Sequence, residues 1–269
     1  MFSSITNMIQ NLRTDPGGTI VTLLYVAVCI LFSLIIHECA HGYMALKCGD
    51  PTAKMMGRLT LDPRKHLDPL GTICMIFLHV GWAKPVPINP NNFRNYRRDY
   101  ILVSLAGIAA NLLMCLASLL ISALLSKLIW QTDVINSLAA GGKKTYMINI
   151  YDNSLATSVY AGMFSMFGDF ARTPWLMYVQ RLFLMLAQMN LGLAVFNILP
   201  VPPLDGYRFL DQFVFKGRLN MNPQTMWIIQ IIFLFICFSG LLSGLLTTVN
   251  SSLMGVFSSV FALIISKQR

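Results

Sequence analysis

The sequence predicts an all-α polytopic membrane protein, and three features of its composition support this fold class. Of its 269 residues, 55% are hydrophobic and only 12% are charged, whereas ordinary soluble domains carry about 25% charged residues. The mean hydropathy is +0.62. These values argue against a soluble enzyme, a disordered chain and a nucleic-acid binder with a solvated basic face. They indicate several membrane segments, and we expect about four to six transmembrane helices.

The first apolar stretch, residues 19–46, is long enough for a spanning helix, because a bilayer core needs about 20 helical residues. The preceding polar residues 1–18 do not resemble a removable signal peptide. After a polar connection at 47–69, the apolar segment 70–82 is too short to cross easily. We expect 70–82 to be re-entrant, with a spanning segment as the alternative. Residues 84–90 are proline-rich and are predicted to be extended.

The second half of the chain continues the pattern. Apolar runs predict further membrane helices at 99–130, 175–199, 226–249 and 251–266. The long connection 131–173 contains apolar residues at helical spacing over 155–170. That stripe indicates an amphipathic helix on the membrane surface or a short helix packed on the bundle.

Lysine and arginine are unevenly distributed among the predicted loops. If 70–82 re-enters, the loops 47–69, 83–98 and 207–223 share one side with the C-terminus, and that side holds 14 of the 20 Lys and Arg. The positive-inside rule makes this side cytoplasmic. We therefore expect the net charge of +9 to reflect cytoplasmic loops and contacts with the lipid bilayer, and we expect no nucleic-acid partner.

One motif near the end of the first apolar helix carries chemistry. His37-Glu38-Cys39-Ala40-His41 reads His-Glu-x-x-His, and residues four apart lie on one helical face. Two imidazoles so placed can bind one Zn²⁺, with the glutamate beside it. Glu38 is the only glutamate among 11 acidic residues. Ionisable groups in a membrane helix are costly and usually functional, although a hydrogen-bonded polar cluster that joins helices is the alternative.

A catalytic zinc site needs a third protein ligand from elsewhere. We expect His66, in a polar loop, to be exposed, and His79 to be a packed or hydrogen-bonded histidine rather than a ligand. Asp205 is the better candidate because the prolines before it break the preceding helix and Gly206 follows it. Taken alone, Asp205 is equally compatible with a turn or a helix cap. The six cysteines form no Cys-x-x-Cys pair and are expected to be buried apolar residues.

Together these motifs resemble the site-2 protease family of intramembrane zinc metalloproteases (peptidase M50-like). His-Glu-x-x-His is followed about 160 residues later by Asn-x-x-Pro-x-Pro-x-Leu-Asp-Gly at Asn197–Gly206. The segments 68–72, 81–87 and 97–99 resemble the compact prokaryotic branch, which lacks PDZ and CBS domains. The resemblance covers roughly residues 20–215.

By that resemblance, His37 and His41 match the family's imidazole ligands for one Zn²⁺ per chain, and Asp205 matches the carboxylate ligand. Glu38 matches the catalytic acid/base. Asn197 matches the asparagine that steadies substrate or oxyanion. These are the catalytic and metal residues that we expect.

A further family pattern, Gly-Pro-x-x-Asn, occurs here as Gly107-Ile108-Ala109-Ala110-Asn111. Ile108 replaces the usual proline, so the helix is expected to be straighter there. Two interpretations of Asn111 are open: a role in the site, or a hydrogen bond that joins helices beside small residues.

We therefore expect one membrane-embedded metalloprotease domain over 1–269, with a catalytic core at about 19–215 and C-terminal helices at 224–266. Its predicted activity is hydrolysis of peptide bonds in or near transmembrane segments of protein substrates, in regulated intramembrane proteolysis or in clearance of membrane peptide remnants. The predicted location is the cell membrane, with the active site toward the cytoplasm.

Other functions remain open from the sequence alone. An ion or proton transporter could use the same polar residues, and a non-catalytic protein could bind transmembrane helices without cutting them. A prenyl-protein processing enzyme is the nearest enzymatic alternative. The segment 84–90 could pair with an unwound substrate as an edge strand through the N–H groups of Val86 and Ile88, or it could be a rigid connection. No feature of the sequence predicts the oligomeric state.

Overall fold

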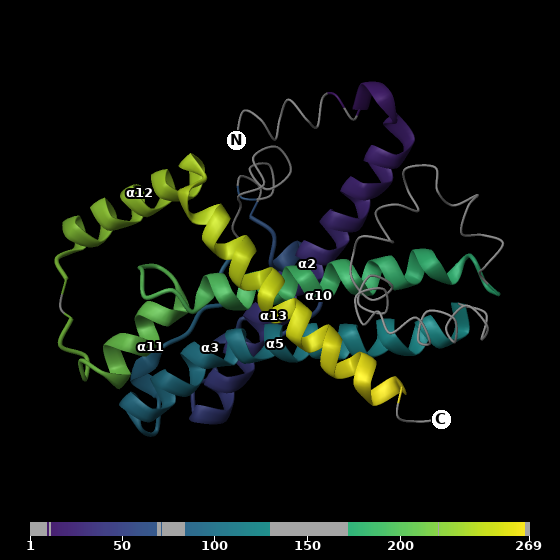
Figure 1. Ribbon diagram of the computed structural model, residues 1–269. Coiled ribbons are helices and arrows are strands. Elements are labelled where there is room, and N and C mark those ends of the chain that lie inside the picture. Colours follow the sequence, from purple (N-terminus) through teal and green to yellow (C-terminus); the bar gives the residue numbers. More distant parts are fainter. Residues whose placement is uncertain are drawn as a thin grey trace.

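The computed structural model describes residues 10, 12–68, 71, 84–129, 172–219 and 221–266. Over these residues the regular structure is helical, with no strand, which confirms the predicted fold class. The elements are α2 (Pro16–Cys48), α3 (Thr52–Met55), η1 (Pro63–Lys65), η2 (Pro90–Asn92), α5 (Tyr96–Ile129), α10 (Leu176–Asn197), α11 (Asp205–Phe213), α12 (Pro223–Ser239) and α13 (Leu241–Ser266) (Figure 1).

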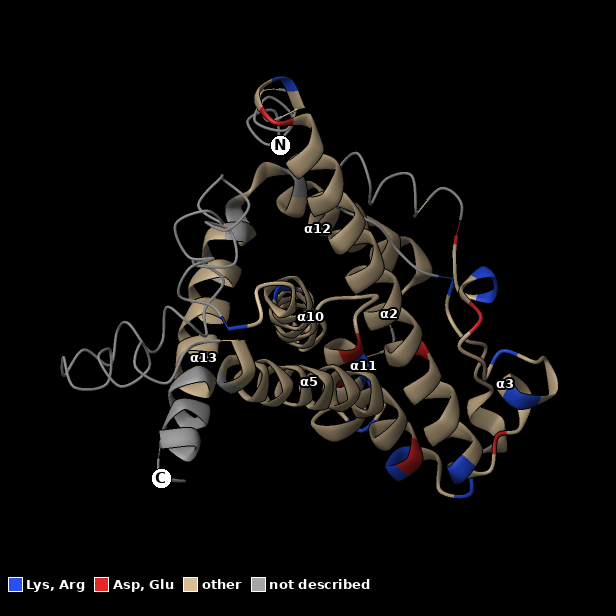
Figure 2. Ribbon diagram, turned by 90° about the vertical axis from the view of Figure 1, so that its right-hand side faces the viewer, with Lys and Arg blue, Asp and Glu red and all other residues tan. Residues whose placement is uncertain are grey.

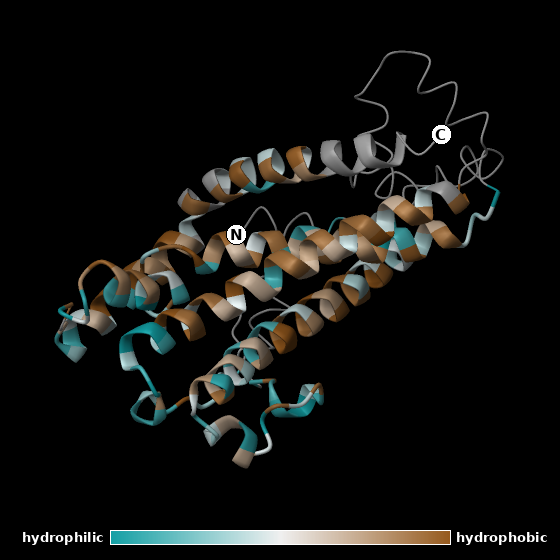
Figure 3. Cartoon of the chain, turned by 90° about the horizontal axis from the view of Figure 1, so that it is seen from below, coloured by the Kyte–Doolittle hydropathy of each residue, from teal (hydrophilic) through white to brown (hydrophobic). Residues whose placement is uncertain are grey.

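Three of the described helices are long and apolar enough to cross a membrane: α2, α5 and α10. On α2, the large apolar side chains Ile20, Leu24, Val28 and Phe32 recur every four residues and are exposed. A stripe of this kind on an apolar helix faces lipid rather than water. Figure 3 shows apolar residues covering these helices, while hydrophilic residues gather in the connecting loops.

The sequence fixes both ends of α2. Asp15 caps its start by accepting a hydrogen bond from the Gly18 N–H at 2.9 Å, and Pro16 occupies the first helical position. Gly49 ends it in the left-handed conformation with φ 111°, which costs glycine nothing. The helix is 33 residues long, about 50 Å, so it exceeds the bilayer core, and it carries His37 and His41 in its C-terminal half.

Helix α5 packs against four other described α-helices, α2, α10, α11 and α13. The core between α5 and α10 includes Cys115, Leu119, Leu184 and Leu191. As expected, α5 runs through Ile108 without interruption. The described cysteines are free thiols: Cys29, Cys48 and Cys115 are buried, as expected, whereas Cys39 and Cys237 are only half-buried. Cys74 lies outside the described residues.

Polar side chains join the spanning helices inside the bundle. Asn190 Nδ2 of α10 donates to Ser33 Oγ of α2 at 2.8 Å, and Gln180 Nε2 donates to Ser126 Oγ of α5 at 2.6 Å. Such bonds are typical of membrane bundles, where apolar burial alone gives helices little reason to associate.

The C-terminal helices differ from the prediction. We expected a spanning helix over 226–249 and a last segment over 251–266, but the chain breaks at Gly240, between α12 and α13. Gly240 adopts the left-handed conformation with φ 81° and caps α12 through its N–H. Hydropathy is continuous across this glycine, so the apolar pattern alone did not reveal the break.

Apart from Gly71, the predicted re-entrant segment 70–82, with His79, lies outside the described residues, and so does the predicted amphipathic helix at 155–170. The residues that flank 70–82 are described, and they meet: the Lys84 N–H donates to the His66 carbonyl at 2.8 Å. The two flanking loops therefore lie at the same end of the bundle, as re-entry requires. Re-entry itself stays a prediction.

Two further contacts bring the other loops to this end. The Arg94 N–H donates to the Cys48 carbonyl, which joins the end of α2 to the start of α5. The Arg97 guanidinium donates to the carbonyls of Gln212 and Phe213 at 2.8 and 2.9 Å, which joins the start of α5 to the end of α11. In Figure 2 the charged residues of the described chain gather mostly around α3, α11 and the neighbouring ends of α2 and α5.

Candidate active site

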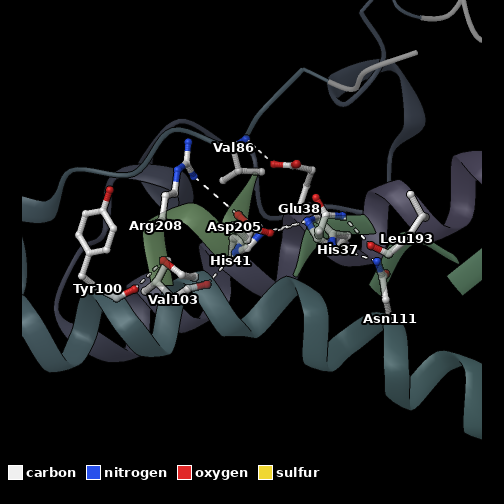
Figure 4. Close-up of polar contacts among 12 residues, drawn as sticks. His37, Glu38, His41, Val86, Tyr100, Val103, Asn111, Leu193, Asp205 and Arg208 are labelled. Atoms are coloured by element: carbon white, nitrogen blue, oxygen red, sulfur yellow. Dashed lines mark hydrogen bonds and ion pairs between the residues drawn. The ribbon is translucent and has the colours of Figure 1, made fainter. Parts of the chain in front are cut away.

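Three side chains from distant parts of the chain meet inside the bundle (Figure 4). Nε2 of His41 lies 3.0 Å from Nε2 of His37 and 3.0 Å from Oδ2 of Asp205, and the His37 nitrogen lies 3.2 Å from the same oxygen. All three residues are buried. The sequence prediction that Asp205 joins the two histidines therefore agrees with their placement.

Asp205 reaches the histidines because α11 begins against the end of α10. A Cβ built on Gly206 would overlap the Ile198 carbonyl and would lie 2.6 Å from the Leu199 carbonyl oxygen. Only glycine allows this approach, so the need here is steric, and not the conformational freedom that the sequence suggested. The Arg97 contacts hold the other end of α11 to α5. Helix α11 is therefore held at both ends, and this fixes the position of Asp205.

Helix α5 sets the tautomer of His41. Nδ1 of His41 lies 2.7 Å from the carbonyl oxygen of Val103. A carbonyl can only accept, so Nδ1 carries the hydrogen and a neutral His41 presents the lone pair of Nε2 to His37 and Asp205. A backbone partner of this kind orients an imidazole toward a metal.

Asn111 of α5 plays the corresponding part for His37. Its amide lies 3.1 Å from His37 Nδ1, and the residue is fully buried. With Nδ2 facing the ring, Oδ1 of Asn111 has no hydrogen-bond partner. Rotating the amide by 180° satisfies Oδ1 and lets it accept from Nδ1–H, which gives His37 the same tautomer as His41. The placement favours a role in the site over a bond that merely joins helices.

Gly107 brings α5 against both imidazoles. A Cβ built on Gly107 would overlap Nε2 of His41 and would lie 2.7 Å from Nε2 of His37. Both atoms are the ones that face Asp205. A side chain at position 107 would therefore occupy the place where the three donor atoms converge.

Glu38 lies beside the cluster, and its carboxylate faces the extended segment. Oε2 of Glu38 accepts a hydrogen bond from the Val86 N–H at 2.8 Å (Figure 4). The Ile88 side chain packs with Ala45, Cys48 and Val103 at the ends of α2 and α5. These contacts favour a rigid connection over a free edge strand in this state, and pairing with substrate stays a hypothesis.

His66 and Asn197 are the two remaining residues for which the sequence made a prediction. We expected His66 to be exposed, but it is 1% exposed, with Nε2 2.8 Å from the Thr60 carbonyl, because its loop folds back on α2. The expectation was wrong. Asn197 donates one N–H of its side-chain amide to the Leu193 carbonyl of its own helix at 3.0 Å.

Comparison with known proteins identifies the family. The sequence profile of peptidase family M50 matches residues 25–239, which span α2 to the end of α12 and include the whole candidate site.

The chain belongs to peptidase family M50.

Relatives agree with this assignment. The chain is 32% identical over 241 residues to YwhC of Bacillus subtilis, a candidate zinc metalloprotease, and the match covers 88% of this chain and 92% of the relative. It is 28% identical over 221 residues to Rip2 of Mycobacterium tuberculosis, which also bears the name of a candidate zinc metalloprotease. That match covers 78% of this chain and 64% of Rip2. No solved structure matches the chain.

The donor atoms fit zinc. Ligand atoms about 2.1 Å from a tetrahedral zinc ion lie about 3.4 Å from one another, and the three distances here are 3.0 to 3.2 Å. Two imidazole nitrogens and one carboxylate oxygen leave one position open, as catalytic zinc sites require. Family, spanning helices and donor set agree: the protein is an intramembrane zinc metalloprotease.

The sequence did not reveal how much of the site α5 supplies. The Val103 contact is made by a backbone carbonyl, which any residue at position 103 would supply. Arg97 entered the sequence analysis only as one of the basic residues of the loop 83–98 and as part of the segment 97–99. Gly107 was visible within a recognised pattern, but its importance depends on which atoms lie opposite it.

The Gly107 contact gives a direct prediction. Gly107→Ala should remove most of the bound zinc, because the new methyl group occupies the place of convergence. Zinc per chain is measured by atomic absorption on the purified protein. The matched control is Gly192→Ala on α10, where a Cβ would meet only Asn250 Nδ2, at 3.9 Å. Equal zinc contents in the two variants would contradict the proposed place of the metal.

Proposed function

We propose that this M50 protease cuts peptide bonds in or near transmembrane segments of membrane-protein substrates, with His37, His41 and Asp205 as its zinc ligands. The biological setting would be regulated intramembrane proteolysis or clearance of membrane peptide remnants. The observation that carries the proposal is the convergence of three buried donor atoms from α2 and α11 beside Glu38.

The residues divide the chemistry between them. Zinc, when bound, supplies Lewis acidity toward a carbonyl oxygen and toward water. Glu38 is the proton carrier in our proposal: it takes a proton from the attacking water and passes it to the leaving nitrogen. Since Oε2 already accepts from the Val86 N–H, we assign the transfer to Oε1.

Asn197 is proposed to steady the substrate or the developing oxyanion. The bond to the Leu193 carbonyl occupies one of the two N–H groups of its amide, and the second remains as a donor.

Transmembrane substrates fit the site because it lies within the bundle, in the C-terminal half of α2. A helix hides its scissile carbonyls within its own hydrogen bonds, so part of the substrate must unwind before it reaches Glu38. Exposed backbone groups are tolerated at membrane depth only where protein or water satisfies them. Polar loops at the same end of the bundle could provide such partners.

The proton carrier can be tested without disturbing the metal. Glu38→Gln should keep zinc and lower the turnover number by about a thousandfold or more, since general acid–base catalysis contributes at least about a hundredfold and the other residues act with it. The assay uses purified enzyme and a quenched-fluorescent Leu/Ala peptide of about 20 residues. Cleavage at the wild-type rate would refute the role of Glu38.

The ligand set has its own test. His37→Ala and Asp205→Ala should each lower the zinc content of the purified protein, because two remaining donors hold zinc weakly. Asp211→Ala, on the same helix α11 but outside the cluster, is the control and should keep its zinc. A full complement of zinc in either ligand variant would remove that residue from the set.

We also propose that the site faces the cytoplasmic side. The supporting fact is that the basic loops after α2, before α5 and after α11 meet at the end where the site lies, and positive loops stay in the cytoplasm. A cysteine placed at the exposed Lys216 in a background without native cysteines should react with an impermeant maleimide only in inverted membrane vesicles. Labelling in right-side-out cells would contradict this orientation.

A further inference from the structure

Residues 84–89, which we call the strap, cross beside the site, and the prolines among them limit their hydrogen-bond donors. Pro85 and Pro87 have no N–H, so the strap has four backbone donors. The donor at its centre, Val86, is the one that binds Glu38 Oε2 at 2.8 Å. The strap therefore holds the residue that we propose as proton carrier.

One side chain holds the strap at the level of Val86. Nη2 of Arg58 donates to the Lys84 carbonyl at 2.9 Å and to the Pro85 carbonyl at 3.2 Å. These two carbonyls immediately precede the Val86 N–H in the chain, so Arg58 fixes the peptide planes that aim this N–H. The Lys84 N–H is fixed as well, by the His66 carbonyl.

The far end of the strap is held by Asp50, which is fully buried just after α2. Asp50 Oδ2 accepts from the Asn89 N–H at 2.7 Å. Burial raises the pKa of Asp50, but hydrogen bonds from Thr52, Asn92 and Asn89 outweigh burial and hold it below its usual value. Asp50 is therefore an anion at neutral pH and a strong acceptor.

Packing keeps the strap close to α2. The Val86 side chain is buried, and a Cβ built on Gly42 would lie 2.9 Å from Val86 Cγ1 and 2.6 Å from Leu59 Cδ2. Gly42 thus lets Val86 approach the helix turn that carries Glu38. A larger residue there would lift the strap without removing any hydrogen-bonding group.

We propose that Arg58 is a positioning residue of the proteolytic reaction, which acts by clamping the strap so that the Val86 N–H fixes the Glu38 carboxylate. The inference rests on the proposed role of Glu38. A glutamate side chain has three rotatable bonds, and proton transfer requires hydrogen-bond distance. Holding one oxygen leaves the other in a defined place, whereas a misplacement of about 1 Å can cost about a hundredfold in rate.

The first test separates positioning from substrate binding. Arg58→Ala should lower kcat toward the quenched-fluorescent Leu/Ala peptide by about tenfold or more, with KM changed by less than about threefold and zinc retained. Arg58→Lys should recover part of the rate, because an ammonium can reach the carbonyls but lacks the planar geometry. The control is Arg64→Ala, a charge removed from the same loop at a side chain 92% exposed.

The second test measures the hydrogen bond between the Val86 N–H and Glu38 directly, without an activity assay. Amide hydrogen exchange of the purified full chain should show Val86 protected in the wild type and exchanging about tenfold faster in Arg58→Ala and in Gly42→Ala, because an amide that loses its partner exchanges through local opening. Glu38→Gln keeps a carbonyl acceptor and should keep the protection, whereas Glu38→Ala should lose it.

The outcomes are distinguishable. Unchanged kcat in Arg58→Ala, or a rate loss matched by zinc loss, would overturn the positioning role, and so would unchanged Val86 exchange. A higher kcat would also overturn it, because it would mean that the clamp restrains Glu38 instead of aiding it. If wild type and Glu38→Gln cleave equally, the proposed function fails, while hydrogen exchange still reports on the clamp.

Discussion

Three lone-pair donors converge within 3.2 Å of one another inside an apolar bundle, and this convergence is the constraint on which the rest of the structure depends. Two imidazole nitrogens that both present lone pairs, together with a carboxylate oxygen, repel one another unless a cation or protons lie between them. Burying such a group in a membrane helix is costly. A divalent metal ion satisfies all three atoms at once.

Helix α5 makes the convergence possible, although it contributes no ligand. The Val103 carbonyl fixes the tautomer of His41, Asn111 lies against Nδ1 of His37, and Gly107 leaves the space that the donor atoms need. Arg97, in the first turn of α5, holds the end of α11. The helix thus orients α2 and α11 relative to each other.

Much of this could be predicted from the sequence, and the limits have physical causes. Apolar runs predicted α2, α5 and α10 because hydrophobic length alone decides whether a helix can span. The motif around Glu38 and the turn at Asp205 predicted which side chains meet. The break at Gly240 escaped prediction, since one glycine in an apolar run carries a weak signal.

Burial in loops was harder to predict than burial in helices. His66 lies in a polar stretch, yet it is buried because the loop folds back on α2 and its ring bonds the Thr60 carbonyl. The clamp of Arg58 on two strap carbonyls was equally invisible, because backbone acceptors leave no trace in the residue pattern.

Zinc K-edge X-ray absorption on the purified enzyme tests the central claim most directly. The account predicts a first shell of nitrogen and oxygen atoms at about 2.0–2.2 Å, with the multiple scattering of two imidazole rings. A sulfur atom at about 2.3 Å would bring Cys39 into the shell, and a single imidazole would remove one histidine. Either result would contradict a metal centre built from His37, His41 and Asp205.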